Sequence, residues 1–107
     1  MILKFAKEIS WTKHAQAKMR FYGLSEQRVR RVLNSPKRTE EGIAPNTVAM
    51  MQPALIKTKD GKQTWSQEIW VMVQKLKIIS VWRYPGRTKP GEPLPVDILS
   101  EIKESLF

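Results

Sequence analysis

The chain has 107 residues, no cysteine and one histidine, and its nineteen Lys/Arg against ten Asp/Glu give a net charge of +9. This length predicts a single domain, residues 1–107, with one modest hydrophobic core. The lack of cysteine excludes disulfides, thiolate metal sites and cysteine nucleophiles, and a single histidine argues against a transition-metal centre. We therefore expect no metal and no cofactor.

The positive charge is concentrated in the first third of the chain. Residues 1–38 contain ten Lys/Arg and two Glu, whereas residues 39–107 contain nine Lys/Arg and eight Asp/Glu. Such asymmetry is typical of proteins that bind a nucleic acid, an acidic membrane or an acidic protein, but a merely solubilising surface gives the same composition. No segment has the length of a membrane span or the pattern of a secretory signal, so we expect a cytoplasmic protein without a membrane partner.

The first predicted helix begins after Thr12, a good N-cap residue, and stops at Gly23, which suits a helix C-terminus. Apolar residues recur every three or four positions on one side, as expected of a buried helix face. They are Trp11, Ala15, Met19 and Tyr22. The opposite side carries Lys13, Gln16 and Arg20.

A second helix is expected to begin after the N-cap residue Ser25 and to end before Pro36, because the residue preceding proline resists the α-helical conformation. Its inner face contains Val29, Val32 and Leu33. Only Gly23 and Leu24 separate Ser25 from the first helix, so the two should form a tight helical hairpin.

From about residue 39 the pattern favours three or four antiparallel strands. Residues 47–58, 65–74 and 76–84 are the predicted strands, with Pro53 marking an edge or a bulge and Asp60-Gly61 forming a hairpin turn. Alternation places Ile69, Val71 and Val73 on one face of the second strand and Trp70 and Met72 on the other. In the third, it places Ile79, Val81 and Arg83 on one face and Ile78, Ser80, Trp82 and Tyr84 on the other. Both faces are largely apolar, which predicts a sheet covered on both sides.

The last part of the chain begins with a loop rich in proline and glycine at residues 85–95, and residues 96–106 have the pattern of an amphipathic helix. The predicted fold class is therefore α+β: an N-terminal helical hairpin packed on a three- to four-stranded antiparallel sheet, plus a C-terminal helix.

His14 is the residue that points most directly to chemistry. It lies early in the first predicted helix, and Lys18 follows one turn later on the same side. Histidine titrates near neutral pH, so it can remove a proton from a ribose 2′-hydroxyl, and a neighbouring ammonium can stabilise the phosphorane-like anion that follows. The alternative is a histidine that caps or packs beneath the helix and has a structural role only.

Arg83 and Tyr84 form the second candidate pair, where an apolar strand leaves the sheet before Pro85-Gly86. A guanidinium suits a phosphate, and Tyr84 or Trp82 could stack on a base. Otherwise the aromatic residues belong to the core and Arg83 is simply exposed. Backbone neutralisation of a nucleic acid would fall to Lys13, Arg20, Arg28, Arg30, Arg31, Lys37 and Arg38.

The helical hairpin contains the pattern His14-Ala15-x-x-Lys18-Met19-x-x-Tyr22-Gly23-Leu24-Ser25, followed by Val29, Val32-Leu33 and Pro36, and the last strand contains Lys77-Ile78-Ile79-Ser80-Val81-Trp82. This pattern resembles that of small bacterial proteins classed as domain of unknown function 4258, whose usual form is His-Ala-x-x-Arg-Met-x-x-Arg-Gly-Ile-Ser. The resemblance covers about residues 11–84. Two positions depart from it: Lys18 lacks the guanidinium fork, and Tyr22 removes a phosphate contact.

That family is similar to the RelE-like and barnase–EndoU–colicin group of metal-independent ribonucleases, many of which are toxins of toxin–antitoxin pairs. The resemblance implies an RNA-binding cleft between helices and sheet, with His14 at the family's histidine, Lys18 at its arginine and Ser80 at a common hydroxyl position. We therefore expect a toxin-like endoribonuclease acting on free or ribosomal RNA by transfer to the 2′-oxygen, with an acidic antitoxin as protein partner. In this expectation His14, Lys18, Arg83 and Tyr84 form the catalytic site.

Two other functions fit the same residues. One is a nucleic-acid-binding module without chemistry, whose affinity depends on salt. The other is an interaction protein whose basic face docks an acidic partner and has no affinity for nucleic acid at moderate salt.

Overall fold

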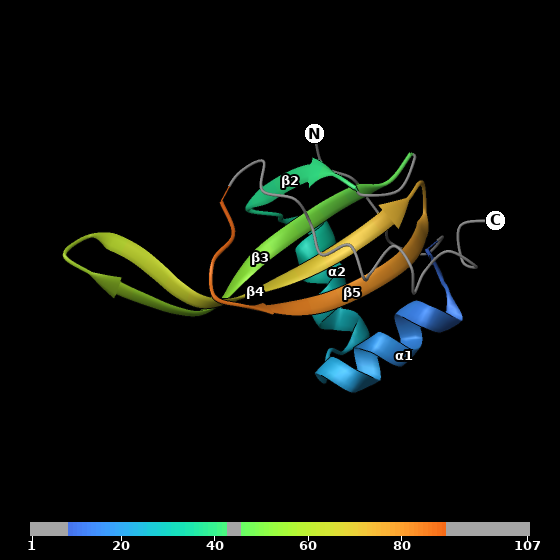
Figure 1. Ribbon diagram of the computed structural model, residues 1–107, viewed down its shortest axis with the longest axis horizontal. Coiled ribbons are helices and arrows are strands. Elements are labelled where there is room, and N and C mark those ends of the chain that lie inside the picture. Colours follow the sequence, from blue (N-terminus) through green and yellow to red (C-terminus); the bar gives the residue numbers. More distant parts are fainter. Residues whose placement is uncertain (1–8, 43–45, 90–107) are drawn as a thin grey trace.

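The computed structural model describes residues 9–42 and 46–89, in which two short helices precede most of a mixed five-stranded sheet (Figure 1). The elements are β1 (Ser10–Trp11), α1 (Lys13–Tyr22), α2 (Glu26–Asn34), β2 (Arg38–Glu41), β3 (Val48–Lys59), β4 (Lys62–Gln74) and β5 (Lys77–Pro85). The strand order is β1-β5-β4-β3-β2, and β1 is parallel to β5 while the other neighbours are antiparallel. The α+β class is confirmed.

The expected three or four antiparallel strands are an incomplete description of the sheet. The structure adds β1 parallel to β5, and β2 pairs with the beginning of β3. These two strands have two and four residues, which is too short for alternation to show in the sequence. The predicted helix at residues 96–106 and most of the loop at residues 85–95 lie outside the described residues.

The predicted helix caps are confirmed. The Thr12 hydroxyl accepts a hydrogen bond from the Ala15 amide, and the Ser25 hydroxyl accepts one from Arg28. Gly23 has φ of 65°, in the left-handed region, where it ends α1 and allows the chain to enter α2 within three residues.

The strands β3, β4 and β5 form an antiparallel meander, and its turns lie where the sequence predicted them. Asp60 and Gly61 have φ of 52° and 76°, as in the two-residue turns that match the twist of a β-hairpin. Pro53 is in an edge position as predicted, because β2 pairs with β3 only from Val48 to Met51. The β3–β4 ribbon extends beyond the rest of the sheet as an arm (left in Figure 1).

A bulge changes the faces of β5 relative to the prediction. Val73 pairs with Ile78, but the preceding Met72 pairs with Ser80, so Ile79 is an extra residue in β5. As a result Ile78 joins Val81 in the core beneath the helices, whereas Ile79 packs with Trp82 on the opposite face. The predicted grouping of Ile79 with Val81 was wrong for this reason.

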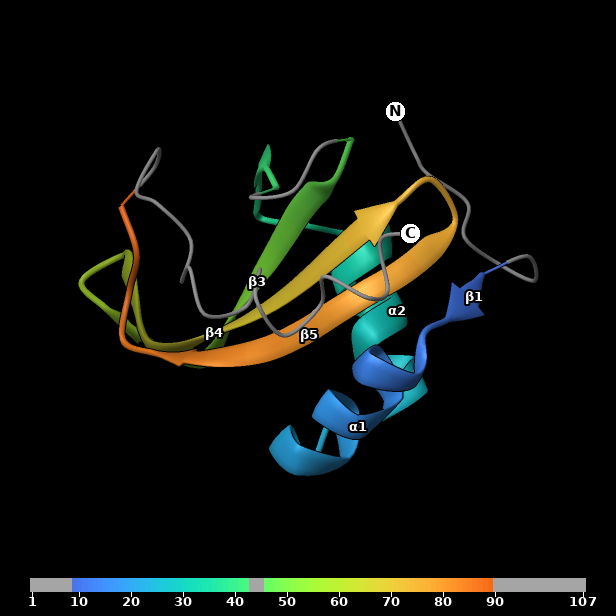
Figure 2. The ribbon, with the colours of Figure 1, turned by 45° about the vertical axis from the view of Figure 1, so that its right-hand side comes forward.

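Both faces of the sheet are buried, as the apolar strands predicted. The face that carries the helices has a core made by Ala15, Met19, Leu24, Val29, Val32, Leu33, Met50, Ile69, Val71, Val73, Ile78 and Val81. The opposite face has a second core of Ala49, Met51, Trp70, Met72, Ile79 and Trp82. α1 packs against β5, and α2 packs against β4 and β3. Both helices lie on the same side of the sheet (Figure 2). In the described part of the chain, no helix has the length and hydrophobicity needed to cross a membrane.

Candidate nucleic-acid interface and catalytic residues

His14 is held against β5 at the N-terminal end of α1. Its Nε2 atom lies 3.1 Å from the Ser80 hydroxyl oxygen, which is buried. The preceding Thr12 fixes the helix start, because its amide donates to the Ile78 carbonyl at 3.2 Å and its hydroxyl donates to the Ile79 carbonyl at 3.1 Å. These hydrogen bonds fix the start of α1 against β5, and the contact with Ser80 orients the imidazole.

Lys18 lies one turn after His14, half-buried, and its ammonium reaches towards the C-terminal end of α1. The Nζ atom is 5.6 Å from the centroid of the Phe21 ring and 6.0 Å from that of Tyr22. These distances are within the range of cation–π attraction. Phe21 itself is 76% exposed. Along α1, from its first turn to its last, the order of these side chains is therefore His14, Lys18 and Phe21.

Arg83 is placed at the other end of α1 from His14. Its Nε atom donates a 2.8 Å hydrogen bond to the Tyr22 carbonyl, one of the last carbonyls of the helix. A ten-residue helix is about 15 Å long. The structure thus does not bring Arg83 together with His14 around one phosphate, as the expected catalytic site required.

Tyr84 is directed away from Arg83, onto the opposite face of β5. It packs, half-buried, against the second core, in which the Trp70 and Trp82 rings stack with centroids 5.9 Å apart. The four expected catalytic residues therefore do not form one cluster. His14 lies at the start of α1, whereas the Lys18 ammonium and Arg83 lie towards its end. Tyr84 lies on the opposite face of β5.

The basic residues of the first third differ in what they contact. Lys13, Arg20 and Arg31 are exposed. Arg30 lies over the Trp11 ring and pairs with Glu26, and Lys37 lies over Trp65. Arg28 and Arg38 are half-buried, and both donate hydrogen bonds to neighbouring groups of the fold. Some of the basic residues expected to bind nucleic acid therefore also make contacts within the fold.

Glu68 is a buried group that the sequence analysis did not select. Its carboxylate, fully buried, accepts hydrogen bonds from the indoles of Trp65 and Trp70 and from the amide and hydroxyl of Thr88. Arg38 donates to the same Thr88 and stacks on Trp70, 5.0 Å from the ring centroid. The signal in the sequence was a carboxylate directly before the apolar pair Ile69-Trp70 in a predicted strand. A charge buried there is costly unless it has hydrogen-bond partners.

Burial by itself raises the pKa of Glu68, but the hydrogen bonds from Thr88, Trp65 and Trp70 outweigh it and hold the pKa below its ordinary value. The group is therefore a structural anion at neutral pH. It ties the segment after β5 to the middle of β4.

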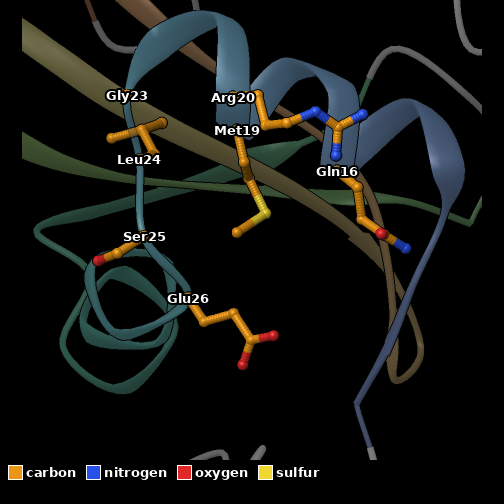
Figure 3. Close-up of a pocket in the computed structure, with 7 residues that line it drawn as sticks. All are labelled: Gln16, Met19, Arg20, Gly23, Leu24, Ser25 and Glu26. Carbon is orange, nitrogen blue, oxygen red and sulfur yellow. The ribbon is translucent and has the colours of Figure 1, made fainter.

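Two hollows lined by described residues do not include the predicted catalytic residues. One, of about 410 Å³, lies between α1 and α2, where Met19 points between the helices with Gln16 and Arg20 on one side and Glu26 on the other (Figure 3). Another, of about 490 Å³, lies at the β4–β5 turn. No group of three or more His, Asp or Glu in the described ranges is arranged to hold a metal ion.

Comparison with known proteins gives no relative: no family model matches the chain, and neither does any curated protein or solved structure. The resemblance seen in the sequence is therefore a hypothesis that these comparisons do not support.

Proposed function

We propose that this protein is an RNA-binding, metal-independent endoribonuclease of the toxin type, in which His14 transfers the proton. The observation that carries the proposal is the 3.1 Å contact between His14 Nε2 and the buried Ser80 hydroxyl. A general base must be held in one orientation, and a hydrogen bond to one ring nitrogen achieves this. The helical hairpin on an antiparallel meander, as in RelE-like ribonucleases, is part of the same proposal.

In this reaction His14 removes the proton of a ribose 2′-hydroxyl, and the 2′-oxygen attacks the adjacent phosphorus. The bond from phosphorus to the 5′-oxygen breaks, and that oxygen takes a proton from water. The products are a 2′,3′-cyclic phosphate and a 5′-hydroxyl. Lys18, one turn from His14, supplies positive charge near the developing anion in this proposal, once its ammonium swings from the Phe21 and Tyr22 rings towards His14.

The basic surface supports RNA as the substrate. Lys13 and Arg20 are exposed on the helix that carries His14, and Arg31 is exposed on the next helix. Cations at such positions neutralise a phosphate backbone without reading its sequence. An acidic antitoxin, the protein partner in this proposal, would occupy the same surface.

A second candidate function is RNA binding without cleavage. It is favoured by the placement of Arg83 and Tyr84, which lie away from His14. In this case Lys13, Arg20 and Arg31 bind RNA as above, and His14 joins α1 to β5.

The test is RNA cleavage in EDTA by the wild type and His14→Gln, a variant whose amide can still contact Ser80. Gln27→Ala, an exposed change on α2 purified in the same way, is the matched control for the substitution. We expect cleavage by the wild type and the control, and none by His14→Gln at an unchanged melting temperature. Full cleavage by His14→Gln would falsify the role of His14, and salt-sensitive binding with no cleavage by any variant would establish the second candidate.

A further inference from the structure

One row of residues crosses the helix-covered face of the sheet below the junction of α1 and α2. Gln52 of β3 pairs with Ile69 of β4, and Ile69 pairs with Arg83 of β5. Ile69 is buried in the core beneath the helices. Because paired residues in a sheet point to the same side, Gln52 and Arg83 flank Ile69 under the helices.

Gln52 is oriented by α2 and in turn orients Arg28. Its side-chain nitrogen donates to the Arg31 carbonyl at 2.9 Å and to the Ser35 carbonyl at 2.8 Å. The amide oxygen is therefore turned towards Arg28, whose Nη1 atom donates to it. Arg28 is therefore held at the Gln52 end of the row. Arg83 forms the other end, where its hydrogen bond to the Tyr22 carbonyl fixes its guanidinium.

Both guanidinium groups are thus fixed by neutral acceptors. Within residues 9–42 and 46–89, the ion pairs of arginine with carboxylates are those of Arg30 with Glu26 and Arg38 with Glu40, and neither Arg28 nor Arg83 has one. Burial lowers the pKa of Arg28, and the charges of Arg31 and Arg83 lower it further. Arginine stays protonated even so, which leaves neighbouring like charges without a counter-charge.

We propose that Arg28 and Arg83, with the exposed Arg31 at the rim, form a binding site for a phosphate group. A guanidinium has five donors in a fixed plane, and each of the two inner arginines uses one of them in the hydrogen bonds above. A tetrahedral anion between them accepts from the remaining donors and relieves the like-charge repulsion. We call this arrangement the arginine seat.

The ligand is a phosphate of the RNA backbone, an assignment that rests on the proposed function. The seat lies at the C-terminal end of α1, about 15 Å from the end that carries His14. An RNA strand held there passes along α1 before its ribose reaches His14. The seat thus binds a phosphate remote from the cleaved bond.

The anion itself is tested by thermal unfolding in sodium sulfate and sodium chloride at equal ionic strength. The proteins are the wild type, Arg28→Gln, Arg83→Gln and Lys57→Gln, which removes one exposed charge from the β3–β4 arm. Sulfate stabilises proteins without binding, so the decisive quantity is the sulfate-minus-chloride shift in melting temperature across the four proteins. We expect a larger shift in the wild type and Lys57→Gln than in both arginine variants.

An equal shift in all four proteins would overturn the seat. If Arg83→Gln fails to fold because the cap of α1 is lost, Arg28→Gln alone decides. Inorganic phosphate in place of sulfate is expected to give the same order of shifts.

The RNA source of the phosphate is tested by binding of a single-stranded RNA oligonucleotide as a function of salt. Loss of one phosphate contact should weaken binding to all sequences alike and reduce the slope of log K against log salt by about 0.7. We expect this for Arg28→Gln and Arg83→Gln. If both arginine variants bind RNA as tightly as the wild type but have lost the sulfate-specific shift in melting temperature, the site binds free phosphate. That result would overturn the RNA assignment. Loss of cleavage in His14→Gln with these slopes intact concerns His14 and not the seat.

Discussion

The carboxylate of Glu68 accepts a 2.6 Å hydrogen bond from the hydroxyl of Thr88, twenty residues further along the chain. Glu68 lies in β4, and Thr88 follows β5, where Arg38 from β2 also binds it. The contact therefore joins β2, β4 and the segment after β5 through one buried anion. It makes Glu68 the polar centre of the face opposite the helices.

Replacing Glu68 by glutamine should destabilise the fold. The amide oxygen cannot accept all the hydrogen bonds that Trp65, Trp70 and Thr88 now donate, and the amide brings two donors into a site made of donors. We expect a loss of about 2–3 kcal/mol in the free energy of unfolding, measured by urea denaturation. Glu41→Gln, an exposed change on β2, should stay near the wild type. Equal stability of the Glu68 and Glu41 variants would show that these hydrogen bonds contribute nothing.

The same carboxylate predicts a dependence of stability on pH. The pKa of Glu68 is lower in the folded protein than the ordinary value of about 4.5, so the unfolded chain binds its proton more readily. The stabilisation is complete above pH 4.5 and is lost as the pH falls through the folded-state pKa. The measurement is the difference in unfolding free energy between the wild type and Glu68→Gln from pH 7 to pH 3. It should shrink below pH 4.5, and a constant difference down to pH 3 would contradict the prediction.

Local signals in the sequence were sufficient for the helices and the long strands. Thr12, Gly23 and Ser25 act through hydrogen bonds and φ angles within a few residues, so their effect can be predicted from the neighbouring sequence alone. The turn at Asp60-Gly61 is local in the same sense. The bulge at Ile79 depends on how β5 meets β4, and alternation within one strand cannot reveal it.

The candidate site was predicted less well than the fold. His14 and Ser80 are 66 residues apart and come together only because α1 lies along β5. Arg83 was expected beside them, but three further residues along β5 place it at the other end of α1, where it caps the helix. The direction of a side chain at the end of a strand depends on what the neighbouring helix offers, here the Tyr22 carbonyl.

Gly23 should be sensitive to any side chain. A Cβ atom at this position meets no atom within 4 Å, so the cost of alanine comes from the backbone, whose φ of 65° is unfavourable for L-residues. We expect Gly23→Ala to lower the free energy of unfolding by about 1–2 kcal/mol. Gly23→Asn should lose less, because asparagine tolerates the left-handed region. The order glycine, asparagine, alanine in thermal unfolding tests this, and alanine equal to glycine would contradict it.

Ser80 should act as a positioning residue for His14 if the protein cleaves RNA. The hydroxyl is buried, so it does not reach the substrate, but its contact with Nε2 sets the orientation and the hydrogen bonding of the imidazole. We expect Ser80→Ala to reduce the cleavage rate about tenfold to a hundredfold, because a misplaced base loses much of the 10²–10⁴-fold gain from proton transfer. The pH profile of cleavage should shift in this variant, since one partner of the imidazole has changed. Ser66→Ala, at an exposed position of β4, is the matched control and should keep both rate and profile. Ser80→Thr, which restores a hydroxyl, should recover part of the rate. A Ser80→Ala protein that cleaves with the wild-type rate and pH profile would show that the contact between His14 and Ser80 only joins α1 to β5.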